Sequence, residues 1–465
     1  MPNVYDVIVI GGGPGGEVLA GRCAGGGLSA VVVENDHVGG ECSFWACMPS
    51  KTLLRPGEVL AAARRVPGAR EAVRGELDAG AALARRDEVV NRWDDGGQAR
   101  WLEGAHVDLV RGTGRLAGVR EVEVEEPNGV RRRLTARRGV VIATGSAPVT
   151  PPIEGLAQIR TWDNRGATEA KSVPRRLLVL GGGGVGVEMA QAWRSLGSEV
   201  VLIQASDRLL RAEEPFVGEE IQRAFESQGI EVITGTPMAE ATRAAADAPV
   251  HVRLEDGRQL VADELLLAVG RKPRTDDVGL ESVGLQAGSA LEVDDGLRVL
   301  GLEEDWLFAI GDVTGRALLT HISKYHARIA ADRLLGDEDA RVEHDAVPRI
   351  LFTDPQVAAV GLTEKRARDA GIDVVTASCN FADVAGATVG GEDVSGGVKL
   401  VVDRRRKVLV GATFVGPGIG DLLHSATVAI TGEVPLSRLR HAVPCFPSLS
   451  EVWLVALESL ELDRA

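Results

Sequence analysis

Two stretches of the chain share one order of apolar and polar positions. In "VIVIGGGPGGEVLAGRCAGGGLSAVVVEN" an apolar β-type run is followed by a glycine-rich turn, a helix of small residues and a second β-type run. The stretch "RRLLVLGGGGVGVEMAQAWRSLGSEVVLIQASDR" repeats this order further along the chain. Strands that alternate with helices in this way predict parallel sheets in an α/β fold. We therefore expect two α/β units built to one plan.

Both glycine-rich turns have the spacing Gly-x-Gly-x-x-Gly. The first glycine permits a tight turn, the second lets the backbone approach a pyrophosphate, and the third brings the helix close to the strand. The helix N-terminus adds unpaired N–H groups that suit phosphates. We therefore expect a dinucleotide at each turn, bound through Gly11, Gly13 and Gly16 in the first unit and through Gly181, Gly183 and Gly186 in the second.

The residue that ends the second β-type run differs between the two units. Glu34 ends the first, where a carboxylate can accept hydrogen bonds from a ribose. Gln204 holds the matching position in the second, so the acid that would repel a 2′-phosphate is missing there. Ser206 and Arg208 follow closely and suit a phosphate, which favours NADPH over NADH. The alternative is that Arg208 is an ordinary surface arginine.

Two cysteines, Cys42 and Cys47, lie close together in "GGECSFWACMPSK". With only five cysteines in 465 residues, a disulfide-rich secreted fold is not expected. A continuous helix would separate the two by about 7.5 Å along its axis, whereas a disulfide needs Cα atoms within roughly 7 Å. Bridging them requires a distorted turn, which Gly39, Gly40 and Pro49 permit. Such a bridge is reducible and suits redox chemistry; two buried spectator thiols are the alternative.

Length and charge narrow the classes of function. The chain has 465 residues, of which 26% are charged and 45% hydrophobic, as expected of a globular protein with roughly three domains. Its net charge of −15 disfavours nucleic acid and anionic membranes as partners. The chain opens on a strand pattern without a signal peptide, and no apolar run suits a membrane span, so we expect a cytoplasmic protein. One basic run, Val130–Arg138, is expected to be a solvated edge strand.

The cysteine motif resembles the active-site signature of the flavoprotein disulfide reductases, the group of dihydrolipoamide dehydrogenase, glutathione reductase and mercuric reductase. Further family motifs follow in order: "VVIATGSAP", "LLLAVGRKP", "LFAIGDVTG", "RILFTDPQVAAVGLTE" and "VLVGATFVGPGIGDLL". The resemblance covers essentially the whole chain. It implies FAD at the first glycine turn, NADPH or NADH at the second, and a homodimer.

The resemblance also implies a domain order. Two doubly wound, Rossmann-like nucleotide-binding domains are expected, followed by a C-terminal α+β dimerisation domain. Residues 1–150 and 275–345 would bind FAD, 151–274 would bind NAD(P)H, and 346–465 would form the interface domain.

Residue roles follow from the same resemblance. Cys47 faces the flavin as the thiolate of a charge-transfer complex, and Cys42 attacks substrate. Lys51 lies near the flavin and pairs with Glu188, because an ammonium stabilises the anionic reduced ring and a carboxylate makes its burial tolerable. Glu451 is the glutamate that orients the catalytic histidine in the family. Further cofactor contacts are implied for Gly40, Gly114, Thr144, Gly145, Gly270, Arg271 and Asp312; no metal ligand is expected.

The C-terminal segment departs from the family pattern. The family has a segment of the type HxHPTxxE, whereas this chain has "HAVPCFPSLSE". Aligning Pro447 and Glu451 puts Phe446 where the acid–base histidine of the partner subunit should stand. Because acid–base catalysis contributes about 10²–10⁴-fold, efficient reduction of lipoamide or glutathione disulfide is not expected. His441 and Cys445 are the local substitutes that remain open.

Together these features predict an FAD-dependent NAD(P)H oxidoreductase. Electrons would pass through the Cys42–Cys47 disulfide to a small-molecule disulfide, a soft metal ion or another electrophile such as a quinone. The same parts run backward would make a dithiol oxidase, and a quinone-type reductase that uses the same flavin is a further alternative. A flavin-bound carrier subunit without turnover is the alternative from another class, and the intact cysteine pair and second glycine turn disfavour it.

Overall fold

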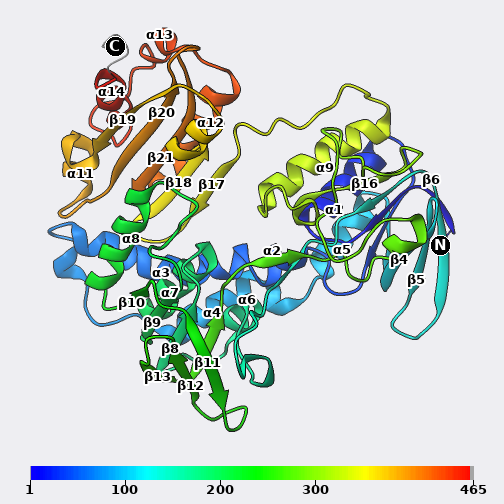
Figure 1. Ribbon diagram of the computed structural model, residues 1–465, viewed down its shortest axis with the longest axis horizontal. Helices are drawn as coiled ribbons and strands as arrows, with labels where there is room; N and C mark the ends of the chain where they lie inside the picture. Colours follow the sequence, from blue (N-terminus) through cyan, green and yellow to red (C-terminus); the bar gives the residue numbers. More distant parts are fainter. Residues whose placement is uncertain (1, 461–465) are drawn as a thin grey trace. The chain divides into compact units, whose positions relative to one another are not determined.

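The computed structural model describes residues 2–460, which divide into two compact units. The first comprises Met1–Pro49, Arg86–Val149 and Gly270–Glu343; the second comprises Ser50–Arg85, Thr150–Val269 and His344–Ala465. Helices α3 (Cys47–Arg65) and α4 (Ala79–Val89) run across the boundaries between them. Each unit is described by itself below, with the element labels of Figure 1.

The first unit is built on a mixed sheet of strand order β3-β2-β1-β6-β5-β4, with β16 beside β6. Strand β1 pairs in parallel with β2 and β6, and its residues Val7, Ile8 and Val9 have no exposed surface. Continuous apolar runs of this kind are typical of parallel strands covered on both faces. The strands of the mixed sheet are β1 (Val4–Ile10), β2 (Ala30–Glu34), β3 (Val107–Arg111), β4 (Thr113–Gly118), β5 (Glu121–Glu125), β6 (Arg131–Ile142) and β16 (Leu307–Ala309). Strands β7 (Ser146–Pro148) and β15 (Arg271–Pro273) form a separate two-stranded sheet.

Helices α1 (Pro14–Gly25) and α9 (Thr320–Leu335) lie side by side on this sheet (Figure 1). They approach so closely that a side chain on Gly15 would place its Cβ 2.2 Å from Ser323 Oγ. The unit also contains α2 (Gly40–Phe44) and α5 (Gly96–Gly104). The close packing of α1 on α9 fixes the first turns of both helices relative to each other.

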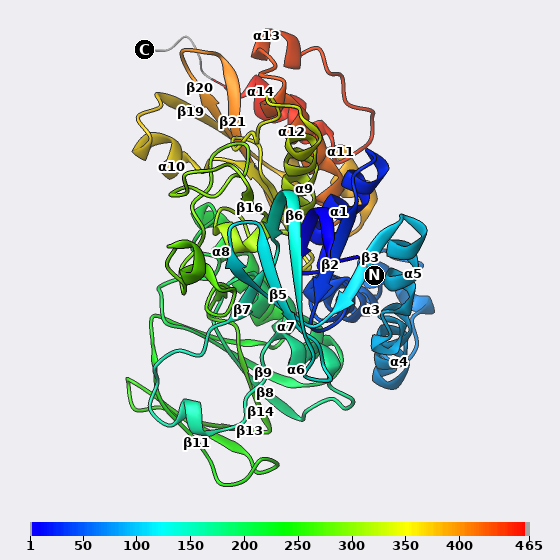
Figure 2. The same ribbon diagram turned by 90° about the vertical axis from the view of Figure 1, so that its right-hand side faces the viewer.

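Strand β6 corrects the expectation for the basic run. It is not an edge strand, because it pairs with β1 on one side and with β5 and β16 on the other, as Figure 2 shows for β5 and β6. Its exposed arginines are balanced by the neighbouring strand: Arg131 pairs with Glu123 at 3.4 Å and Arg133 with Glu121 at 3.2 Å. The sequence shows the exposed face of β6 but not the strands that pair with it.

The second unit contains a parallel sheet of order β10-β9-β8-β14, a small antiparallel sheet β11-β12-β13, and an antiparallel sheet β17-β18-β21-β20-β19. Helix α12 packs on β18 and β21, and α14 packs on β19 and β20. The nucleotide-type part has α6 (Asn164–Glu169), β8 (Arg176–Leu180), α7 (Gly184–Ser195), β9 (Glu199–Gln204), α8 (Pro215–Ser227), β10 (Glu231–Thr234), β11 (Met238–Arg243), β12 (Val250–Leu254), β13 (Gln259–Ala262) and β14 (Glu264–Leu267). The C-terminal part has β17 (Pro348–Leu351), β18 (Gln356–Gly361), α10 (Glu364–Asp369), β19 (Val374–Asn380), α11 (Ala385–Gly390), β20 (Gly397–Asp403), β21 (Val408–Gly416), α12 (Leu423–Thr431), α13 (Leu436–Leu439) and α14 (Glu451–Glu458).

These sheets confirm the predicted fold class of two doubly wound units and a C-terminal α+β domain. In the part of the chain that the structure describes, no helix has the length and apolar character to cross a membrane.

The contacts around the glycine turn of the second unit explain the Gly-x-Gly-x-x-Gly spacing. A side chain on Gly186 would place its Cβ 1.8 Å from the carbonyl oxygen of Gly181, so only glycine allows α7 to approach β8. A Cβ on Gly183 would meet nothing within 4 Å, which leaves open space at the helix N-terminus. The first unit repeats this arrangement at Gly11, Gly13 and Gly16.

Replacing the two kinds of glycine should therefore have different effects. Gly186→Ala should lower the free energy of unfolding by about 1–3 kcal/mol, the usual cost of forcing extra atoms into packed structure. Gly183→Ala, at a position with φ of −83°, should keep the stability and weaken nicotinamide nucleotide binding. Denaturant unfolding and nucleotide titration of both variants check this, and equal stability of the two variants would contradict it.

Candidate active site

The two cysteines lie on either side of a break between helices. Cys42 belongs to α2, and Cys47 is the first residue of α3. Between them Trp45 has φ of −136°, so the helix does not continue through this stretch. The preceding Gly39 and Gly40 both have positive φ, at 104° and 57°, which glycine adopts at little cost. The backbone break brings two side chains together that one continuous helix would hold apart.

The cysteine side chains interact directly. Both are thiols in this structure and both are half-buried. A side-chain hydrogen bond with Cys47, together with burial, raises the pKa of the Cys42 thiol. Two close thiols cannot both ionise readily, because a negative charge on one raises the pKa of the other. Thr320 Oγ1, at the start of α9, lies 3.3 Å from Cys47 Sγ and can hydrogen-bond it. Sequence reasoning missed Thr320; its position just after the "GDVTG" motif was the available signal.

Asp312 and Arg271 meet through a residue that the sequence analysis also missed. Ser146 Oγ donates to Asp312 Oδ2 at 2.6 Å and accepts from Arg271 Nε at 2.8 Å. Burial raises the pKa of the Asp312 carboxyl, which the hydrogen bond from Ser146 partly opposes. Ser146 directly follows the Thr144–Gly145 turn, and Thr144 Oγ1 donates to the carbonyl oxygen of Arg274 at 2.7 Å. These hydrogen bonds thus link Asp312 to Arg271 through Ser146, and Thr144 to the backbone of Arg274.

Two of the predicted cofactor glycines have close neighbours within the first unit. A Cβ on Gly40 would lie 2.9 Å from Gly13 Cα, so the cysteine segment packs directly on the glycine turn. A Cβ on Gly114 would lie 3.0 Å from Val33 Cγ1, which explains a glycine beside strand β2. Gly270 has φ of 134° and so needs to be glycine for its backbone alone.

Glu34 and Gln204 make the same backbone contact in their two units. Glu34 Oε2 accepts from the N–H of Gly12 at 2.6 Å, and Gln204 Oε1 accepts from the N–H of Gly182 at 2.8 Å. Burial raises the pKa of Glu34. The amide therefore replaces the carboxylate in shape and hydrogen bonding but brings no negative charge.

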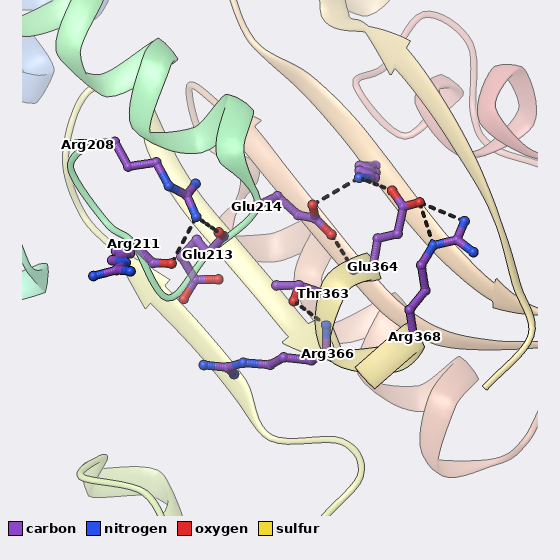
Figure 3. Close-up of polar contacts among 9 residues, drawn as sticks. Arg208, Arg211, Glu213, Glu214, Thr363, Glu364, Arg366 and Arg368 are labelled. Carbon is purple, nitrogen blue, oxygen red and sulfur yellow. Dashed lines mark hydrogen bonds and ion pairs between the residues drawn. The ribbon is translucent and has the colours of Figure 1, made fainter. Parts of the chain in front are cut away.

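Arg208 braces the loop that follows Gln204. Figure 3 shows its guanidinium directed at backbone oxygens, and Nη2 donates to the carbonyls of Arg211 at 3.0 Å and Glu213 at 3.3 Å. Its Nη1 is buried and has no hydrogen-bond partner among the described residues. Gln204 Nε2 donates to Ser206 Oγ, which in turn donates to the carbonyl of Arg208 at 3.1 Å. The loop thus places Arg208, whose Nη1 has no hydrogen-bond partner among the described residues, close to the uncharged Gln204.

Lys51 and Glu188 form an ion pair within the second unit. Lys51 Nζ lies 2.6 Å from Glu188 Oε2, and Glu188 Oε1 accepts from the N–H of Phe352 at 2.9 Å. Glu188 is only 5% exposed. A buried carboxylate is tolerable because both of its oxygens have partners. Lys51 follows Cys47 by four residues on α3, so the same helix carries both groups.

The C-terminal segment has its own arrangement. Phe446 is 78% exposed, and His441 and Cys445 are exposed as well. Glu451 begins α14, and its Oε2 accepts from the backbone N–H groups of Gly386 at 3.2 Å and Ser448 at 3.3 Å. Glu451 therefore accepts hydrogen bonds from the backbone of its own domain. In the family, the matching glutamate orients a histidine.

The glycine turns fit dinucleotides. Neither α1 nor α7 has a side-chain cap at its N-terminus, and the second glycine of each turn leaves open space. Unsatisfied N–H groups at such helix ends suit phosphates. Among the described residues, no group of three or more His, Cys, Asp and Glu could hold a metal ion.

Comparisons with known proteins agree with this architecture. Residues 5–328 match the family model of the pyridine nucleotide-disulphide oxidoreductases, and residues 347–457 match the dimerisation domain of that family. The chain is 36% identical to a dihydrolipoyl dehydrogenase of Thermus scotoductus, covering 98% of both, and 30% identical to a mercuric reductase of Lysinibacillus sphaericus, covering 99% of this chain and 83% of that protein. It superposes on the Cu(II) complex of the HOCl-induced flavoprotein disulfide reductase RclA from Escherichia coli with a TM-score of 0.85 at 27% identity, covering 98% of this chain and 99% of RclA.

The two nucleotide-type parts and the C-terminal domain define a class of flavin-dependent oxidoreductases. The chain belongs to the pyridine nucleotide-disulphide oxidoreductase family. It is accordingly an oxidoreductase of a family that binds FAD and NAD(P)H.

The order in which the thiols ionise should be visible in absorbance. After two-electron reduction of the FAD-loaded protein, a long-wavelength charge-transfer band should appear, persist in Cys42→Ser and vanish in Cys47→Ser. Anaerobic absorbance spectra of the three proteins check this. The reverse pattern would exchange the roles of the two cysteines.

Proposed function

We propose that this enzyme oxidises NADPH and passes the electrons through the Cys42–Cys47 pair to a small electrophile. The observation that carries this proposal is the direct contact of the two thiols across the α2–α3 break. Bound FAD supplies the two-electron exchange between the nicotinamide and the thiol pair. The chain's own residues then hold the charge, present the attacking sulfur and set the protonation state.

The thiol pair divides the work of reduction. With a disulfide acceptor, Cys42 gives its proton to solvent and its sulfur attacks one acceptor sulfur, so that a mixed disulfide forms and the other acceptor sulfur departs as a thiolate. Cys47 then attacks the Cys42 sulfur, re-forms the disulfide and releases the rest of the acceptor. Two electrons move from the thiol pair to the acceptor, and the released thiolates take protons from water.

The class of acceptor follows from Phe446, which takes the place of the family's acid–base histidine. A phenyl ring can neither stabilise a thiolate nor protonate a leaving thiol. Acceptors that need no proton delivery are therefore favoured. A soft metal ion is one, since paired thiolates bind soft metals well, and the similarity to a mercuric reductase supports that choice. Quinones and unusual small disulfides are the other candidates.

Steady-state oxidation of NADPH with a panel of acceptors tests the proposal. The panel should hold lipoamide, glutathione disulfide, a quinone and Hg²⁺ with excess thiol. Turnover of the quinone or Hg²⁺ above the rate with either disulfide is expected. A protein that binds FAD but oxidises neither NADPH nor NADH with any acceptor would overturn the proposed function.

The coenzyme preference rests on Gln204 and Arg208. Gln204 keeps the backbone contact of Glu34 without the charge that repels a 2′-phosphate, and Arg208 has a donor to spare. The RclA structure and the dihydrolipoyl dehydrogenase are similar to this chain over nearly their whole lengths. That similarity supports NAD(P)H use in general, whereas these two side chains favour NADPH.

We also propose a homodimer. The match of residues 347–457 to the family's dimerisation domain supports it. That domain exposes several apolar side chains, namely Val389, Val428, Val443, Phe446 and Leu454.

Phe446→His should raise disulfide reduction by at least about tenfold, a conservative value below the usual acid–base contribution. Turnover with a quinone should barely change, because a quinone releases no thiolate and takes its two protons from water, and it serves as the control. Initial rates with lipoamide and with the quinone measure both effects. Rapid lipoamide reduction by the unmodified protein would contradict this account and point to His441 or Cys445.

Gln204→Glu should shift coenzyme preference toward NADH. The new carboxylate keeps the bond to the N–H of Gly182 and repels the 2′-phosphate of NADPH, and like charges in contact are costly. The ratio of kcat/KM for NADPH to that for NADH should fall by at least about tenfold. An unchanged ratio, measured beside Gln222→Glu on the exposed face of α8, would show that position 204 does not read the phosphate.

A further inference from the structure

Helix α9 brings a cation to the thiol pair. Its first residue, Thr320, lies 3.3 Å from Cys47 Sγ. Lys324 follows by four residues, so it lies one turn further along the same face of the helix. Its ammonium is close enough to Cys42 to lower the pKa of that thiol, against the rise caused by Cys47 and burial.

The charge of Lys324 also acts on helix α1. Gly15 on α1 packs directly on Ser323 of α9, and Glu17 and Lys324 follow these two residues closely on the two helices in contact. Burial raises the pKa of Glu17 to about 7, while Lys324 lowers it and Glu34 and Asp95 raise it. No hydrogen bond to the Glu17 carboxyl is present among the described residues. Lys324 is exposed, and its charge acts both on Glu17 of α1 and on Cys42 of α2.

Cys42 needs such a charge. It must become a thiolate to attack, yet its neighbour Cys47 raises its pKa. A histidine at the position of Phe446 would supply the compensating charge, and this chain has none there. The polar groups that lower the pKa of Cys42 come instead from α9, namely Thr320 and Lys324.

We propose that the Lys324 ammonium stabilises the attacking thiolate of Cys42 from within the same subunit, in the place of the absent acid–base histidine. Glu17 on α1 is the carboxyl that this ammonium also favours in its charged form. The inference rests on the proposed function, since it assigns the attack on the acceptor to Cys42. In that attack Lys324 gives up no proton: Cys42 loses its proton to water, its sulfur forms the bond to the acceptor, and Lys324 holds the negative charge until that bond exists.

The test measures the reactivity of Cys42 directly. In a Cys47→Ser background, the FAD-loaded protein is reduced chemically and treated with iodoacetamide from pH 5 to 10, and modification of the Cys42 peptide is followed by mass spectrometry. Lys324→Gln should slow the reaction at pH 7 by about threefold, a size typical of partly exposed charge pairs, and move the profile to higher pH. Lys324→Arg should restore most of the rate.

Arg328→Gln is the matched control. Arg328 lies one turn further along α9, with its guanidinium 5.8 Å from the ring centre of Tyr325, so this variant removes an equal charge on the same helix. It should leave the profile of Cys42 unchanged. If Lys324→Gln has the same profile as Arg328→Gln and the parent, the proposal is wrong.

Two further measurements separate the possible outcomes. In the Cys47→Ser protein with Lys324 intact, raising the salt from about 0.05 to 1 M should slow the reaction of Cys42 at pH 7, because salt screens an exposed ammonium. An unchanged rate contradicts the proposal even if Lys324→Gln does not fold. Thiols formed by NADPH in the unmodified protein are counted separately. Absence of those thiols overturns the proposed function, whereas the chemically reduced protein still tests Lys324.

Discussion

The interruption of the helix between Cys42 and Cys47 is the constraint on which the chemistry depends. Gly39 and Gly40 turn the chain with positive φ, and α3 begins afresh at Cys47. Gly40 also packs against Gly13, so the cysteine segment and the glycine turn fix each other. The thiols are consequently held beside the helix N-terminus that suits a dinucleotide phosphate. A bulkier residue at Gly40 would disturb both features together.

Electrostatics around the pair bears on how easily each thiol ionises. The hydroxyl of Thr320 lies 3.3 Å from Cys47 Sγ and also lowers the pKa of Cys42, which its neighbour Cys47 and burial raise. In the proposed function, Cys47 stores the charge and Cys42 attacks once it is deprotonated. The rate of attack by Cys42 then depends on the charge beside its sulfur. Phe446, in the family's histidine position, and Lys324 on α9 therefore both bear on this attack.

Local sequence patterns predicted the parts of this molecule that depend on local geometry. The spacing of Gly181, Gly183 and Gly186 follows from one helix meeting one strand, and the structure gives each glycine a distinct neighbour or open space. Contacts between distant segments were harder to predict. Ser146 joins Asp312 to Arg271 across more than a hundred residues of sequence, and no periodicity marks such a serine. The backbone role of Glu451 was missed because its partner Gly386 carries no side-chain signal.

The central claim is that nicotinamide nucleotide reduces a Cys42–Cys47 disulfide. It is tested most directly by anaerobic titration of the purified FAD-loaded protein with NADPH, followed by alkylation and mass spectrometry of each cysteine peptide. The account predicts that two thiols per chain appear on reduction, at Cys42 and Cys47, while Cys23 and Cys379 stay unchanged. Flavin that is reduced without any new thiol at these two positions would contradict it.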